Sequence, residues 1–290
     1  VFYMIKVGTS GFSFPDWVGT IYPANIKKGD MLPYYEQKLG FKITEINSSY
    51  YTIPSPKSFE GMLKKTSPEF EFTVKAHKSM THEIRDKETG TFIDNKDAFG
   101  RFLYAVDPLR KEGRLSAILA QFPYSFHAIK DNYTYLLAFK ERLKDIPLVV
   151  EFRNYSWHNE RSLTFLKENH IGYCIVDESK LNGLMPYHPN ATPDLGYFRF
   201  HGRNLNWFDA SAAERYDYLY TPEELKSFVP DIKNISGITG KTIVMFNNCH
   251  AGQSVKNAIE MLKLLGHSDI TTTMRYRHLL IKFTQTKSYC

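Results

Sequence analysis

The chain has 290 residues, of which 42% are hydrophobic and 15% aromatic. This excludes a disordered or low-complexity protein, because such chains are poor in aromatic residues. The net charge is +6. Residues 267–290 hold four basic residues and one acidic residue, so the other 266 residues carry only +3. A charge this diffuse does not favour nucleic-acid binding by the main part of the chain.

Cysteine usage and hydropathy indicate the cellular setting. The three cysteines form no C-x-x-C motif, which argues against a disulfide framework and a structural zinc site. No apolar run approaches the roughly 18 residues that span a bilayer. We therefore expect a cytoplasmic protein without a membrane partner. The sequence leads to no prediction about whether the chain forms oligomers.

Short β-branched or aromatic runs alternate with helix-length segments along the chain. The eight runs are residues 5–10, 42–48, 70–76, 115–122, 147–153, 172–178, 196–202 and 242–248. Several are almost continuously apolar, which is typical of parallel strands buried on both faces. The segments between them include amphipathic stretches at 131–145, 159–169 and 253–265, and a helix start, Thr-Pro-Glu-Glu, at 221.

This alternation predicts an α/β fold, a one-domain (β/α)₈ TIM barrel over residues 4–265. The alternative is an open doubly wound sheet, but its G-x-G-x-x-G fingerprint is absent. Residues 179–194 contain Gly183 and three prolines, so we expect an irregular crossover after the sixth strand. The crossover after the seventh strand is long. We expect residues 266–290 to be a basic tail and not an independent domain.

Charged and polar residues gather where the predicted strands end, often in pairs at i and i+2, which share one face of a strand. They are Glu45, Asn47, Lys75, Gln121, Glu151, Arg153, Asp177, Arg199, His201 and Asn248. The aromatic residues Tyr50 and Trp157 follow two of these strand ends. Catalytic groups of TIM barrels lie at this rim, so we predict that these residues form one ligand site.

The mixture of carboxylates and cations suggests a role for each group. We expect Glu151 to act as general base and His201 as acid, with Glu45 and Asp177 as further acid/base candidates. The cations would hold a small carboxylated or phosphorylated ligand, such as a sugar derivative. The reaction would then be that of a lyase, isomerase or hydrolase.

Other interpretations remain open. One alternative is a non-catalytic protein that binds the same anion. Another is a buried ion-pair network, such as Glu151 with Arg199 or Asp177 with Lys75. A metal-dependent hydrolase or nuclease-like barrel is a further alternative. The carboxylates and His201 would suffice for one divalent ion, but the neighbouring cations oppose it, so we predict no cofactor and no metal.

Seven segments together resemble the YecE-like proteins, the family called domain of unknown function 72. They are GTSGFSFPDWVGTIYP (8–23), ITEINSSYY (43–51), FEFTVKAHKSMTH (70–82), LAQFPYSF (119–126), EFRNYSW (151–157), YFRFHGR (197–203) and IVMFNNCHAGQSVKNA (243–258). The resemblance covers about residues 4–265 and implies a TIM barrel without an established activity. Its motifs include the strand-end residues named above and add Arg203 and Asn247.

The segment LLGHSDITTTMRYRHLL (264–280) instead resembles the C-terminal box of tyrosine recombinases. There a histidine precedes the nucleophilic tyrosine by nine positions, as His267 precedes Tyr276. The chain lacks the arginine and lysine partners that stabilise phosphoryl transfer. We therefore expect this segment to be an inactive remnant of a gene fusion. As an alternative, the basic tail would contact nucleic acid.

Overall fold

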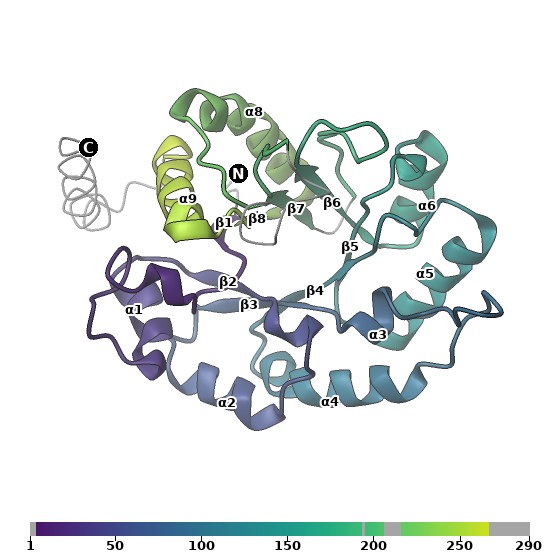
Figure 1. Ribbon diagram of the computed structural model, residues 1–290, viewed down its shortest axis with the longest axis horizontal. Coiled ribbons are helices and arrows are strands. Elements are labelled where there is room, and N and C mark those ends of the chain that lie inside the picture. The colour runs from purple at the N-terminus through teal and green to yellow at the C-terminus, as the bar shows by residue number, and fades with distance from the viewer. Residues whose placement is uncertain (1–3, 193–194, 206–215, 267–290) are drawn as a thin grey trace.

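The computed structural model describes residues 4–192, 195–205 and 216–266 of the chain. Its strands are β1 (Met4–Thr9), β2 (Ile43–Ile46), β3 (Glu71–Lys75), β4 (Leu115–Gln121), β5 (Leu148–Glu151), β6 (Gly172–Asp177), β7 (Gly196–Phe200) and β8 (Lys241–Phe246). Its α-helices are α1 (Met31–Gln37), α2 (Pro56–Lys64), α3 (Lys78–Thr81), α4 (Lys96–Lys111), α5 (Lys130–Leu143), α6 (Glu160–Glu168), α8 (Pro222–Thr239) and α9 (Gln253–Leu264). The helices surround the strands (Figure 1).

All strand pairs in the sheet are parallel, in the order β1-β8-β7-β6-β5-β4-β3-β2. The predicted α/β barrel is therefore confirmed, and the eighth strand lies beside the first. Each predicted strand run contains or overlaps the observed strand, because a run of apolar residues buried on both faces is a strong signal.

The barrel is nearly closed. Strands β1 and β2 lie side by side, but in the described residues no ladder of backbone hydrogen bonds joins them. The hydroxyl of Tyr35 on α1 bridges them: it accepts from the Thr9 amide at 2.9 Å and donates to the Ile43 carbonyl at 3.2 Å. Gly8 permits the close approach, because a Cβ there would lie 2.3 Å from the Ile43 carbonyl oxygen. A tyrosine side chain thus completes the wall of the barrel.

The crossovers differ as the sequence predicts. Residues 178–192 after β6 contain no helix or strand in the part of that crossover that the structure describes. After β7 the chain returns through α8, which begins with a capping box between Thr221 and Glu224. From the sequence, only the start of this helix was predicted. The helix continues through Pro230 to Thr239, because Phe228, Ile232 and Ile235 are buried along its length.

The N-terminal end of the barrel is closed by a cluster of three charged residues. Glu71 on β3 binds Lys6 of β1 at 2.8 Å and Lys241 of β8 at 2.5 Å. This cluster lies at the opposite end of the strands from the predicted site. None of the described helices is both long and apolar enough to cross a membrane.

Candidate functional site

The strand register decides which side chains enter the barrel. Tyr197 on β7 donates to Glu45 on β2 at 2.7 Å and lies 3.0 Å from the Thr73 hydroxyl, so these residues face one another across the interior. Arg199 follows Tyr197 by two positions and therefore shares its face. In the register, Val176 on β6 pairs with Arg199, so odd-numbered β7 residues and even-numbered β6 residues point inward together.

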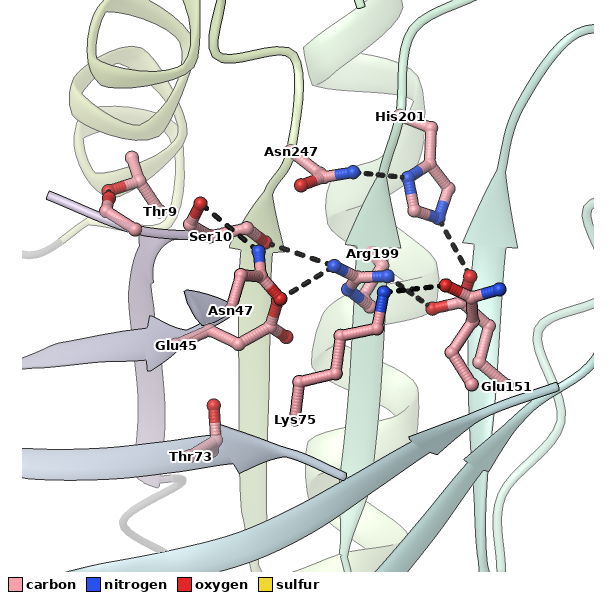
Figure 2. A network of polar contacts seen from close by, with 12 residues as sticks. Thr9, Ser10, Glu45, Asn47, Thr73, Lys75, Glu151, Arg199, His201 and Asn247 are labelled. Atoms are coloured by element: carbon pink, nitrogen blue, oxygen red, sulfur yellow. Dashed lines mark hydrogen bonds and ion pairs between the residues drawn. The ribbon is translucent and has the colours of Figure 1, made fainter. Parts of the chain in front are cut away.

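Arg199 is the centre of a buried network at the C-terminal ends of the strands (Figure 2). Its Nη2 lies 2.7 Å from Glu45 Oε1 and its Nη1 lies 2.5 Å from Glu151 Oε2. All three side chains are almost completely buried. Charges removed from water need such partners, because an unpaired buried ion is very costly. Both guanidinium ends of Arg199 are therefore already used by carboxylates of the protein.

A second arginine extends the network. Arg153, which follows β5, lies 2.7 Å from Glu151 Oε1 and also binds the buried carboxylate of Glu178. Arg199 and Arg153 hold the pKa of Glu151 well below its ordinary range, against the effect of burial. Burial instead raises the pKa of Glu178 to about 7, although Arg153 opposes this. A carboxylate held ionised by two arginines is a poor proton acceptor, so the geometry disfavours Glu151 as general base.

His201 is the next member of the network. Its Nε2 lies 3.2 Å from Glu151 Oε1, and its Nδ1 lies 2.9 Å from the Asn247 amide nitrogen. Arg153 Nη2 lies 3.3 Å from Nε2, so both ring nitrogens have a neighbouring side chain that can donate. Burial and the charge of Arg153 lower the pKa of His201 to about 3, so the ring is neutral at neutral pH. His201 is thus poorly suited to be the acid that the sequence predicts.

Lys75, at the end of β3, is bonded differently from the arginines. Its Nζ donates to the Gln121 side-chain oxygen at 2.7 Å and lies 4.7 Å from the centre of the Tyr50 ring. Among the described residues, no carboxylate forms an ion pair with it. Burial and the charge of Arg199 lower the pKa of Lys75 to about 7, while Glu151 and Glu45 partly oppose the shift.

A cavity of about 1140 Å³ opens above this network. Its floor includes Glu45, Lys75, Gln121, Arg153 and Arg199. From there it runs outward between the segment after β1 and helix α2. Further lining residues are Ser10, Phe12, Phe14, Asp16, Lys28, Leu32, Asn47, Lys57, Met62, Lys65, Tyr216, Asn247 and His250. The cavity therefore joins a polar floor to apolar walls and a rim that carries lysines.

Several predicted site residues lie on this cavity or contact it. Glu45, Asn47, Lys75, Gln121, Arg153 and Arg199 line it. Glu151 and His201 lie beneath the floor, completely buried. Tyr50 supports Lys75 from one side. Of the two ion pairs that the sequence suggests, the pair of Glu151 with Arg199 is present.

Asp177 and Arg203 lie outside the network of Arg199 and are not among the residues that line the cavity. The Asp177 carboxylate accepts from Arg203 at 2.8 and 2.9 Å and from the Tyr220 hydroxyl at 2.7 Å. Since even-numbered residues of β6 face inward, Asp177 points to the surrounding helices. The residue after it, Glu178, takes the inward position. Asp177 does not form the suggested pair with Lys75.

Asn248 and Trp157 also have structural surroundings. The Asn248 amide donates to the Tyr218 carbonyl at 2.7 Å and to Asn257 at 2.8 Å, and its neighbour Asn247 faces the cavity. The buried Trp157 ring stacks on Phe152 at 4.0 Å. These two residues hold the loops around the mouth and do not line the cavity.

Sequence reasoning missed other members of the site. Glu178 occupies an inward position next to Asp177, which was chosen instead, so the phase of that strand was misjudged. Asn247, which only the family resemblance had added, holds the inward position next to Asn248. Tyr197 begins the same face as Arg199 and was available to the i, i+2 argument. Lys28 and Lys57 reach the cavity from η2 (Lys28–Asp30) and α2, and no strand-end signal marks them.

The donor set does not form a metal centre. In the described residues, no three His, Cys, Asp or Glu side chains are grouped so as to hold an ion. The carboxylates of the network are occupied by arginines, which would repel a cation. The two described cysteines, Cys174 and Cys249, are buried and free.

Comparisons with known proteins agree with this architecture. A family model described as protein of unknown function DUF72 matches residues 6–278. The UPF0759 protein YunF of Bacillus subtilis is 31% identical over 274 residues, which cover 90% of this chain and 95% of YunF. The structure of a DUF72 family protein, TM1631 of Thermotoga maritima, is 47% identical with a TM-score of 0.84 and covers 90% of this chain and 99% of its own.

More distant structures agree in fold. A DUF72 family protein of Enterococcus faecalis, EF0366, has a TM-score of 0.78 at 29% identity, over 90% of this chain and 95% of its own. A xylose isomerase-like TIM barrel protein of Mycobacterium smegmatis, solved with magnesium, has a TM-score of 0.50 at 11% identity, over 82% and 87% of the two chains. The latter likeness concerns the fold alone.

The family model also bears on the C-terminal segment. It extends to residue 278 and so covers most of the segment 264–280 that resembles a recombinase box. Nothing in the comparisons supports a recombinase remnant, and residues 267–290, including Tyr276, lie outside the described residues. With its family model covering nearly the whole chain and a relative 31% identical along it, the chain belongs to the DUF72 family.

Proposed function

We propose that the barrel is an enzyme that acts on a small anionic ligand by proton transfer in the cavity at its mouth, with Lys75 as the group that moves the proton. The observation that carries this is the contrast between Lys75 and the other charges. Glu45, Glu151, Arg153 and Arg199 neutralise one another, whereas the Lys75 amine faces the cavity without a carboxylate partner among the described residues.

The pKa of Lys75 suits this role. A general acid or base works best when its pKa lies near the pH of the reaction. Burial and Arg199 lower the pKa of Lys75 to about 7, so near neutral pH the side chain can both give and take a proton. This replaces the expected base, Glu151, by a residue that the sequence suggested as an anion clamp.

The charge around the cavity favours an anionic ligand. Six lysines and arginines line it, against two carboxylates, Glu45 and Asp16. Of these cations, Arg153 and Arg199 are occupied, but Lys28 and Lys57 at the rim make no ion pair with a described carboxylate and are exposed. Such lysines can hold a carboxylate or a phosphate at the outer end of a ligand.

Proton exchange tests the proposal directly. Phosphorylated and carboxylated carbonyl compounds and sugars are incubated with the protein in D₂O, and the loss of carbon-bound hydrogen is followed by NMR. We expect exchange with the wild type and with Lys64→Met, an exposed control on α2. We expect none with Lys75→Met.

Two results would count against the proposal. Exchange that survives in Lys75→Met would remove Lys75 from the reaction. If a compound raises the melting temperature of the wild type but not that of Lys75→Met, and yet shows no exchange, that result would instead favour the alternative of a non-catalytic binding protein.

A further inference from the structure

We propose that the Lys75 amine is a nucleophile that forms an imine with an aldehyde or ketone bearing an anionic group. This inference deepens the proposed function, because it concerns the same side chain and cavity, but it makes a separate claim. A lysine can move protons without ever forming a covalent bond to its ligand.

The contacts of Lys75 leave its nitrogen available. Gln121 accepts one hydrogen bond at 2.7 Å, and the Tyr50 ring covers one side of the ammonium group. An ion pair with a carboxylate would hold the amine protonated, and the lone pair would then be bound to a proton and not available for attack. No such pair is present among the described residues, and the side chain lies on the floor of the cavity, partly exposed.

The fixed charges beneath the lysine act in the same direction. Arg199 is held by ion pairs with Glu45 and Glu151, and its charge acts on Lys75. A neighbouring cation and a desolvated site are the two means by which proteins keep a lysine neutral and nucleophilic. At a pKa of about 7, roughly half of Lys75 is free amine at pH 7. An ordinary lysine has about one molecule in 2,500 in that form.

The reaction balances without a further reagent. The nitrogen lone pair attacks the carbonyl carbon, and one amine proton passes to the carbonyl oxygen, which gives a carbinolamine. The C–O bond then breaks, and the second amine proton leaves with the oxygen as water. The neutral imine can take one proton from solvent in the open cavity. Nothing is oxidised or reduced in these steps.

The shape of the cavity indicates which carbonyl compounds fit. Its walls beyond the floor include Phe14, Leu32 and Met62, and the rim carries Lys28 and Lys57. A carbonyl group at the floor would therefore continue into an apolar middle and an anionic end. An aromatic aldehyde with a phosphate has these three parts, and a short keto acid or aldehyde acid fills the floor alone.

Reductive trapping tests the inference. The full chain is incubated at pH 7 with glyoxylate or with pyridoxal 5′-phosphate, the imine is reduced by cyanoborohydride, and the modified lysines are identified by peptide mass spectrometry. The expected adduct adds the mass of the carbonyl compound less one oxygen. We expect modification of Lys75 at least tenfold faster than modification of the exposed Lys64 in the same molecule.

Three controls make the result specific. Lys75→Arg keeps the positive charge but has no nucleophilic amine, so it should lose the fast adduct while Lys64 still reacts. The rate at Lys75 should level off above about pH 7, whereas the rate at Lys64 should rise to higher pH. Pyridoxal without the phosphate should react more slowly with Lys75 than the phosphorylated compound does.

The outcomes separate this inference from the proposed function. If neither probe modifies Lys75 faster than Lys64, the imine is wrong, and proton exchange that depends on Lys75 would still support the proposed function. If the fast adduct forms at Lys75 but no compound exchanges hydrogen, the nucleophile stands and the proton-transfer role fails.

Discussion

Replacing Arg199 with methionine tests whether the buried charges are chiefly structural. Arg199 binds Glu45 at 2.7 Å and Glu151 at 2.5 Å. Glu151 would keep Arg153 at 2.7 Å after the replacement. Among the described residues, Glu45 would keep only the hydrogen bond from Tyr197. A buried carboxylate would thus lose its compensating cation.

Removing one partner of a buried ion pair costs about 3–5 kcal/mol. We expect Arg199→Met to lower the free energy of unfolding by this amount. For a domain of this size, each kcal/mol corresponds to roughly 2–4 °C in melting temperature, so the fall would be on the order of 10 °C. Urea denaturation at pH 7, followed by circular dichroism, measures the difference.

A surface arginine provides the matched control. Arg110 binds Asp107 at 2.7 Å, but its side chain is 44% exposed, whereas that of Arg199 is 1% exposed. Exposed pairs contribute about 0–1 kcal/mol, so Arg110→Met should be nearly neutral. In the Arg199→Met background, Glu45→Gln should restore part of the stability, because it removes the uncompensated charge. Equal losses for the two arginine variants, or a further loss on adding Glu45→Gln, would refute this reasoning.

Three further changes test individual contacts. Lys75→Met should stabilise the fold most below pH 7: the folded-state pKa of about 7 is lower than the unfolded one, so the wild type gains stability as pH rises from about 7 to 10.5. Each pKa unit is worth about 1.4 kcal/mol, so the gain in the free energy of unfolding has a ceiling near 5 kcal/mol. Solvent around the partly exposed side chain reduces the expected gain to about 2 kcal/mol, which denaturation curves at several pH values measure. A gain that does not vary with pH would contradict this. Tyr35→Phe removes the acceptor of the buried Thr9 amide and should cost about 1–3 kcal/mol, with faster hydrogen exchange at Thr9; unchanged exchange would show that the hydroxyl does not close the barrel wall. Asp177→Asn should lower the melting temperature through its contacts with Arg203 but leave the rate of imine trapping unchanged; a slower rate would place Asp177 in the site after all.

The sequence was sufficient to predict the barrel and most of the floor of the site. Parallel strands buried on both faces appear as apolar runs. The i, i+2 spacing linked Glu151 with Arg153, which form an ion pair, and Arg199 with His201, which both contact Glu151. In these strands the inward polar residues come in pairs at i and i+2. Each pair shows which of the alternating positions of its strand point into the barrel. The network of Arg199 follows from that phase.

The same reasoning failed where the phase was ambiguous. In β6 and β8 both faces are buried and largely apolar, and two adjacent polar residues follow each run, Asp177 with Glu178 and Asn247 with Asn248, so the alternation did not show which of the two points inward. Glu178 and Asn247 hold the inward positions instead. Protonation was also beyond the sequence, because it depends on three-dimensional neighbours: Arg153 next to His201, and Arg199 next to Lys75.

A direct titration of Lys75 is the most immediate test of the central claim that this lysine, unlike the arginines around it, is poised to react. Lysine side chains labelled with ¹³C are followed by NMR from pH 5 to pH 11, and the Lys75 signal is assigned by its absence in Lys75→Arg. We expect a midpoint near pH 7 for Lys75, well below that of an ordinary lysine at about 10.4. A midpoint for Lys75 that coincides with that of the exposed lysines would contradict it.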